Sequence, residues 1–186
     1  RALIEAKADI EKVGPQGFTA LMFSALNGHE QVARALIEAK ADIEKVGPQG
    51  FTALMFSALN GHDQVARALM DLEKQTAKGS TALILAAQNG HEQVARALIE
   101  AKANLEAQQN EGWTALMYSA QNGHDQVARA LIEAKANIEA VENKGWTAIM
   151  FAAQGGHDLC ARAMIEGKAN LEVQDSDQVT ALNAAC

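Results

Sequence analysis

Short apolar stretches alternate with polar ones along the chain, and the spacing of the apolar residues predicts short helices. In one stretch Leu116 and Ala120 lie one helical turn apart, so both fall on the same face of a helix. Thr114, just before them, is a good N-cap because its hydroxyl can accept hydrogen bonds from the free amides of the first turn. Asn122-Gly123 predicts the end of this helix, since glycine adopts the left-handed conformation at low cost.

A second helix is predicted to begin at His124, because Val127 and Leu131 again lie one turn apart. On its polar side Arg129 and Glu133 are four residues apart and are expected to form an ion pair. The same pairing is expected at Arg34/Glu38, Arg67/Asp71, Arg96/Glu100 and Arg162/Glu166. The polar residues 137–144, which end at a glycine, predict an extended arm that closes in a turn.

This pattern of two helices and an arm repeats along the whole sequence. Residues 1–29 are identical to residues 34–62, an offset of 33. The motif Gly-x-Thr recurs at the same offset, except for an interval of 29 between Gly50 and Gly79. A fixed period of this length indicates a stack of repeats. We expect one domain, with a partial repeat over 1–16, repeats that begin at 17, 50, 79, 112 and 145, and a partial repeat over 178–186.

The repeated motifs resemble the ankyrin repeat, a 33-residue unit of two antiparallel helices and a β-turn arm whose first helix begins T-P-L-H-x-A. The matching segments are Thr114-Ala115-Leu116-Met117 with Ala120, Asn122-Gly123-His124, and Ala136-Asn137-Ile138-Glu139. The resemblance covers essentially the whole chain and implies an all-α repeat solenoid. Alanine replaces the family's proline, and methionine or isoleucine replaces its histidine.

Lysine stands where the family has the glycine that ends the second helix. If these lysines adopt the left-handed conformation, each costs about 1 kcal/mol. They are Lys7, Lys40, Lys102, Lys135 and Lys168.

The short interval before Gly79 predicts a local irregularity in the stack. Residues 71–79 align with 100–112 if Ala-Lys-Ala-Asn is deleted, which removes the end of a second helix. We therefore expect a shortened helix or a kink between residues 62 and 81. The chain begins in a second helix and closes in a first helix, without the polar outer face of a capping repeat. We expect either neighbouring repeats of a longer array or other subunits to cover both ends.

Composition excludes several classes of function. The net charge of −7 and the pI near 5.2 argue against binding to nucleic acid, which requires a basic surface. No apolar run reaches the roughly 18 residues of a membrane span. Two cysteines are too few for a disulfide framework and are typical of a reducing compartment. We expect a soluble protein of the cytoplasm.

No group of residues predicts catalysis, a cofactor or a metal. The histidines occupy equivalent positions about one repeat apart, too far to share a metal ion, and are expected to join adjacent loops by hydrogen bonds. Cys160 stands where other repeats have alanine, which predicts a packing role. We do not expect an enzyme.

The family resemblance implies instead that a protein partner lies in a concave groove formed by the arms and the first helices. The residue between Gly and Thr and the residues before Gly-His are then expected to face the partner. The sites that we predict are Phe18, Leu26, Phe51, Leu59, Gln88, Trp113, Gln121, Trp146 and Gln154. Aromatic anchors are typical of interfaces, although these rings can also pack on the neighbouring arm and hold the stack together.

Three functions remain open. The chain can be a module that binds a partner protein, a structural subunit or spacer in a large assembly, or an accessory to an enzyme or channel elsewhere in the same polypeptide. Nothing in the sequence identifies the partner.

Overall fold

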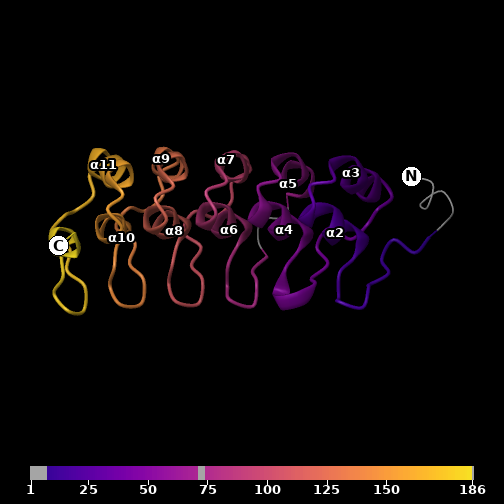
Figure 1. Ribbon diagram of the computed structural model, residues 1–186, viewed down its shortest axis with the longest axis horizontal. Helices are drawn as coiled ribbons and strands as arrows, with labels where there is room; N and C mark the ends of the chain where they lie inside the picture. Colours follow the sequence, from indigo (N-terminus) through magenta and orange to yellow (C-terminus); the bar gives the residue numbers. More distant parts are fainter. Residues whose placement is uncertain (1–7, 71–73, 186) are drawn as a thin grey trace.

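Two parallel rows of short helices run along the stack, with a row of arms below them (Figure 1). The computed structural model describes residues 8–70 and 74–185. The first-helix row consists of α2 (Ala20–Leu26), α4 (Ala53–Asn60), α6 (Ala82–Gln88), α8 (Ala115–Gln121), α10 (Ala148–Gln154) and α12 (Ala181–Ala184). The second-helix row consists of α3 (Glu30–Glu38), α5 (Asp63–Leu69), α7 (Glu92–Glu100), α9 (Asp125–Glu133) and α11 (Asp158–Glu166). The predicted all-α solenoid is confirmed.

Each first helix begins at a threonine, as the sequence predicts. The hydroxyl of Thr114 accepts a hydrogen bond from the amide of Met117, 3.3 Å away, and Thr19, Thr52 and Thr81 cap their helices in the same way. Thr147 differs, because its hydroxyl is buried and has no hydrogen-bond partner among the described residues. The Gly before each histidine has a positive φ, for example 71° at Gly123, which ends the first helix.

The second helices α3, α7, α9 and α11 end with a lysine in the left-handed conformation. Lys135 has a φ of 70°; its amide donates to the carbonyl of Ile132, and the amide of Ala136 donates to the carbonyl of Leu131. This pair of hydrogen bonds is the Schellman motif, in which glycine is the usual residue at this position. Left-handed backbone is likewise found at Lys40, Lys102 and Lys168, whereas Lys7 lies outside the described residues.

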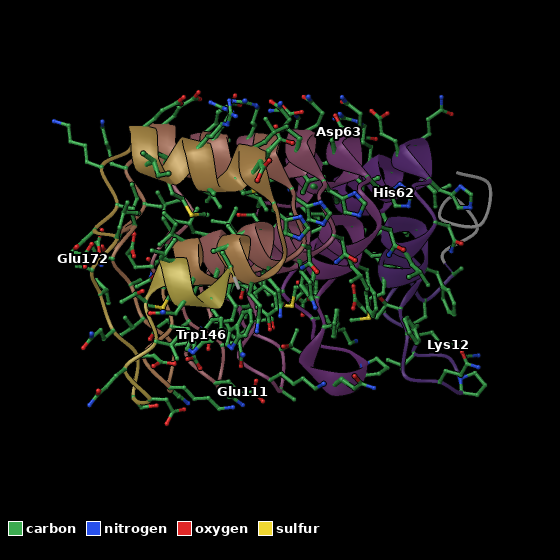
Figure 2. The ribbon with its side chains drawn as sticks, turned by 60° about the vertical axis from the view of Figure 1, so that its left-hand side comes forward. Lys12, His62, Asp63, Glu111, Trp146 and Glu172 are labelled. Carbon is green, nitrogen blue, oxygen red and sulfur yellow. The ribbon has the colours of Figure 1, made fainter. Side chains whose placement is uncertain are left out.

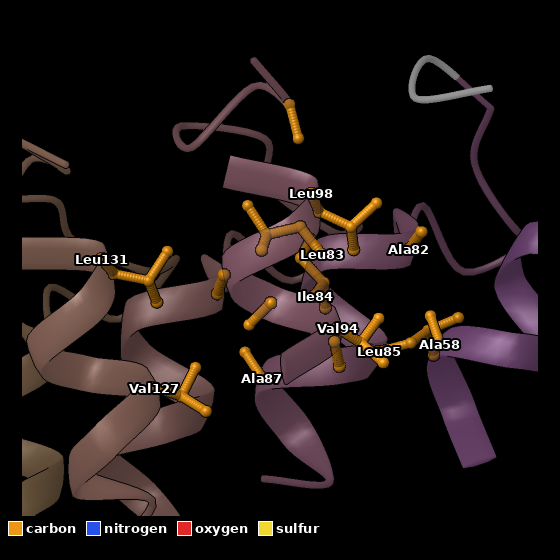
Figure 3. Close-up of a cluster of buried hydrophobic side chains, with 14 of the residues drawn as sticks. Ala58, Ala82, Leu83, Ile84, Leu85, Ala87, Val94, Leu98, Val127 and Leu131 are labelled. Atoms are coloured by element: carbon orange, nitrogen blue, oxygen red, sulfur yellow. The ribbon is translucent and has the colours of Figure 1, made fainter. Parts of the chain in front are cut away.

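The core is a continuous layer of small and branched side chains between the helix pairs. Figure 3 shows side chains of α6 and α7, among them Leu83 and Leu98, close to those of the neighbouring pairs. Successive first helices pack on one another from α2 to α12, and successive second helices from α3 to α11. Ala58, Ala86 and Ala128 are fully buried in this layer, where their small size lets the helices approach closely.

The irregularity predicted before Gly79 lies in α5. This helix has 7 residues, whereas α3 and α7 have 9 each. It ends at Met70, whose φ of 13° is not helical, and residues 71–73 lie outside the described part of the chain. The predicted shortening is confirmed, and the stack continues across it because α4 packs on α6 and α5 on α7.

None of the four predicted ion pairs whose residues are both described forms as predicted. Arg34 contacts Glu30 rather than Glu38, and Glu166, the predicted partner of Arg162, contacts another arginine. Arg96 contacts Glu92 and Glu133 rather than Glu100, and Arg129 contacts Glu166 rather than Glu133. Neighbouring second helices lie side by side, so the guanidinium groups of Arg96 and Arg129 reach a carboxylate on the next helix. Arg67 contacts Glu100 in the same way, whereas its predicted partner, Asp71, lies outside the described residues. These pairs are exposed, and each contributes at most about 1 kcal/mol.

Cys160 is a buried packing residue of α11, as the sequence predicts. Its thiol lies 3.8 Å from the carbonyl oxygen of Ser119 on α8. Burial, with a smaller contribution from Asp125, raises the pKa of this thiol to about 11. The thiol is therefore protonated at neutral pH and screened from reagents.

Replacing a left-handed lysine with glycine should stabilise the stack. We expect Lys135→Gly to raise the free energy of unfolding by about 1 kcal/mol, because glycine has no Cβ to strain this conformation. Denaturant unfolding followed by circular dichroism measures the change. Lys144→Gly is the control: Lys144 is not among the residues with positive φ, so no gain is expected there. Equal effects of the two substitutions would show that the lysine conformation carries no strain.

Cys160 should be unreactive in the folded protein. In a chain carrying Cys186→Ser, we expect a chromogenic thiol reagent at pH 8 to modify Cys160 of the folded protein at least about 100-fold more slowly than in denaturant. The reaction needs both the thiolate form and access of the reagent to the sulfur. Rapid modification of the folded chain would contradict the burial of this side chain.

Candidate partner-binding groove

The arms are turns built to one plan. In each arm the residue three before the Gly donates its amide to the carbonyl of the residue after that Gly, as between Glu142 and Trp146. In the later arms the side chain at this position also accepts amides of the turn. Thr76 accepts from Ser80, Gln109 from Glu111, Glu142 from Lys144 and Trp146, and Asp175 from Asp177 and Val179.

Neighbouring arms are joined by backbone hydrogen bonds. The amide of Asn110 donates to the carbonyl of Lys78 at 3.0 Å, and the amide of Asn143 donates to that of Glu111 at 3.2 Å. The amide of Ser176 donates to the carbonyl of Lys144 at 3.1 Å. The arms therefore form one continuous surface that can hold side chains at fixed positions.

An aromatic ladder runs between the arms and the first helices. We use this name for Phe18, Phe23, Phe51, Phe56, Trp113, Tyr118, Trp146 and Phe151. Each arm ring lies against the ring five residues later: the centroids of Phe51 and Phe56 are 5.0 Å apart, and those of Trp146 and Phe151 are 5.1 Å apart. Some arm rings also reach the next helix, as Trp113 does at 4.2 Å from Phe151. The rings thus pack on the stack and face its surface.

The ladder is interrupted at Ser80 and Leu85, which stand where the other units have an arm ring and a helix ring. A hollow of about 850 Å³ lies at this place. Its apolar lining comes from Phe51, Leu59, Leu85 and Tyr118, and its polar lining includes Ser80, Gln88 and Gln109. We call it the Ser80 hollow.

A second hollow of about 690 Å³ lies toward the C-terminal end of the same face. Trp113, Trp146 and Phe151 supply its apolar lining. Its charged residues are Glu111, Glu142, Lys144, Asp175 and Asp177. We call it the tryptophan hollow; Figure 2 labels Trp146 and Glu111 on the arm side of the stack.

Two ionisable groups beside the hollows are shifted by their surroundings. The amide of Val179 and, less strongly, the amide of Asp177 and the indole of Trp146 lower the pKa of Asp175. The Trp146 Nε1–H donates to Asp175 Oδ2 at 2.6 Å, which orients the indole. Burial raises the pKa of Tyr118, whose hydroxyl accepts a hydrogen bond from the Gln109 side chain.

The histidines hold adjacent units together below this surface. Nε2 of His62 donates to the carbonyl of Leu26, and the same bond joins His91 to Leu59, at distances of 3.2 and 2.9 Å. His124 and His157 make it to Gln88 and Gln121. Glycine is required at position 28, because a Cβ there would lie 2.6 Å from His62 Nδ1. The predicted role of the histidines is confirmed.

The predicted site residues fall into three groups. Phe51, Leu59 and Gln88 line the Ser80 hollow, and Trp113, Trp146 and Gln154 line the tryptophan hollow. Phe18 stacks between Phe23 and Phe56. Leu26 and Gln121 supply backbone carbonyls to the histidines, and Leu26 and Leu59 are half-buried against the core.

Sequence reasoning missed the helix rings and the side chains that accept arm amides. The constant five-residue spacing from Phe51 to Phe56 and from Trp113 to Tyr118 is a signal that could have found the rings. The position three before the Gly, which is Glu142 in one arm and Asp175 in the next, could have found the acceptors.

Other kinds of site find no support in residues 8–70 and 74–185. No three His, Cys, Asp or Glu side chains of these ranges gather closely enough to bind a metal ion. Their helices are also too short and too polar for any of them to traverse a lipid bilayer.

Comparison with known proteins agrees with this architecture. Family models of ankyrin repeats match residues 1–77, 70–142 and 120–165. Among solved structures, the chain is similar to the ankyrin repeat domain of Bcl-3, described as a unique member of the IkappaB protein family. The TM-score is 0.88 at 21% identity, over 100% of this chain and 85% of that one, a likeness that concerns the fold. A search of curated proteins found no match. On its repeat motifs, its helix pairs and the family models that match most of its length, this chain belongs to the ankyrin repeat family.

Proposed function

We propose that this chain binds a partner protein through the face formed by the arms and the first helices. Ankyrin repeats are in general protein–protein interaction modules. The observation that carries the proposal for this chain is the Ser80 hollow, a recess in the aromatic ladder between Phe51 and Tyr118 that has both apolar and polar lining residues. Pockets that contain aromatic residues are typical of the energetic centres of interfaces.

Packing alone does not explain why the ladder stops at this unit. An aromatic ring at position 80 would complete it and would lie between Leu85 and Tyr118, by analogy with Trp113 between Tyr118 and Phe151. Such a ring would stabilise the stack by about 0.5–1.5 kcal/mol. A serine at this position lacks that stabilisation and leaves an opening on the surface that a side chain of a partner can enter.

A structural role is the second candidate, and exposed apolar residues on the second-helix row support it. Leu159 of α11 is 55% exposed, at a position where α9 has the polar Gln126. A subunit or spacer would use the second-helix surface instead of the arm face. The further possibility of an accessory role within a larger polypeptide stays a prediction.

Filling the Ser80 hollow separates the two functions. We expect Ser80→Phe to abolish capture of a partner protein from extracts of cells that express the chain, because the ring occupies the recess. The same substitution should leave the free energy of unfolding unchanged or raise it by about 1 kcal/mol. Affinity capture with mass spectrometry measures the first effect, and denaturant unfolding measures the second.

Gln126→Phe is the matched control, since Gln126 is exposed on α9 in the second-helix row. A protein retained by the unsubstituted chain and by Gln126→Phe, but lost with Ser80→Phe, supports the proposal. Equal retention by Ser80→Phe, with loss in Gln126→Phe, would favour contacts through the second helices and the structural role.

A further inference from the structure

The side chains that accept hydrogen bonds from the arm amides change in charge along the stack. At the position three before the arm Gly, successive arms carry Gly14, Gly47, Thr76, Gln109, Glu142 and Asp175. The first two arms have no side chain there, and Met22 takes up the space beside Gly47. The next two have a neutral acceptor, and the last two have a carboxylate.

In the last four arms a side chain at this position accepts amides of the turn, and this role needs an acceptor but no charge. Oγ1 of Thr76 accepts an arm amide at 3.1 Å, and Oε1 of Gln109 accepts one at 2.7 Å. Oε1 of Glu142 does the same at 2.9 and 3.1 Å. A neutral glutamine would therefore brace the Glu142 arm as Gln109 braces its own. The negative charge of Glu142 exceeds what the local structure needs.

One oxygen of Glu142 has no donor. The residue is only 8% exposed, and Oε1 takes both arm amides. Oε2 has no hydrogen-bond partner in the part of the chain that the structure describes, and Glu142 lines the tryptophan hollow. This oxygen is reached by solvent, so it can accept a hydrogen bond from a donor that enters the hollow.

The groups around this oxygen suit a cation. Four carboxylates and a single amine line the tryptophan hollow, together with Trp113, Trp146 and Phe151. Indole rings attract cations through their π faces, and charge-assisted hydrogen bonds to a carboxylate are stronger than neutral ones. The Ser80 hollow, in contrast, has Lys78 and Glu111 as its charged residues, which balance each other.

We propose that the tryptophan hollow receives a cationic side chain, arginine or lysine, of the partner. The aliphatic stem lies along Trp113 and Phe151, and the charged group donates to Glu142 Oε2. This rests on the proposed function and names the chemistry of the partner: a segment with a basic residue that meets the C-terminal half of the groove.

Tryptophan fluorescence can detect binding of a cationic side chain in this hollow. Its two tryptophans, Trp113 and Trp146, both line the hollow, so intrinsic fluorescence reports on this place alone. The probe is a blocked peptide of alternating glycine and arginine. Its control is the same peptide with citrulline, which has nearly the shape of arginine and keeps three of its five N–H donors but carries a neutral urea in place of the guanidinium. We expect a saturable change with the arginine peptide that weakens as salt rises, and no saturable change with the citrulline peptide.

A second test removes the negative charges of the hollow but keeps a side-chain acceptor for the arm amides at position 142. We expect the double substitution Glu111→Gln and Glu142→Gln to weaken binding of the arginine peptide by about fivefold or more. The unfolding midpoint should stay within experimental error, because Gln109 shows that glutamine serves at this position. Glu172→Gln, an exposed glutamate outside the hollow, should bind the peptide as the unsubstituted chain does.

Equal responses to the two peptides, or unchanged affinity in the Glu111/Glu142 double variant, would overturn the inference. These titrations use no captured partner. If capture depends on position 80 and the arginine peptide still fails, this inference is wrong and the proposed function stands. If the peptide binds as expected and capture does not depend on position 80, the proposed function is the one that fails.

Discussion

No helix pair in this chain can bury its apolar residues by itself, and this constraint determines the rest of the architecture. The buried residues of α6, such as Leu83 and Ile84, lie between α4 and α8, so the core exists only where neighbouring pairs are stacked. In such stacks the stability comes from each unit together with its interfaces to the next. Hydrogen bonds from His62 and His91 to the preceding unit, and backbone bonds between arms, repeat with the same geometry. Even the shortened α5 keeps its contacts with α7.

A regular stack leaves certain positions free to vary. The residue between Gly and Thr in each arm is held at a fixed place on the surface, whatever its side chain. A phenylalanine or tryptophan at this position continues the aromatic ladder, whereas Ser80 interrupts it and leaves a hollow. The same holds for the position three before the arm Gly, where Gln109 and Glu142 both accept arm amides but differ in charge. Variation at these places changes what the surface can bind without changing the fold.

Much of the fold could be predicted from the sequence, because the determinants are local. Thr114 caps its helix, Gly123 ends it, and the left-handed Lys135 follows from the position at which the family has glycine. Parts that depend on the distance between units could not be predicted. The predicted ion-pair partners of Arg96 and Arg129 are wrong, because the distance from each guanidinium to a carboxylate on the next helix depends on the spacing between units. For the same reason, the sequence suggested Trp113 as an anchor but could not reveal that it stacks on Phe151 of the next unit.

Photo-crosslinking from single positions shows whether a partner lies on the arm face. A photoreactive phenylalanine analogue is placed at position 80, inside the Ser80 hollow, or at position 126, on the opposite row of helices, and the chain is illuminated in the cells that express it. We expect a discrete crosslinked protein from position 80 and none from position 126. Crosslinks from position 126 alone would contradict this expectation and would place the partner on the second helices.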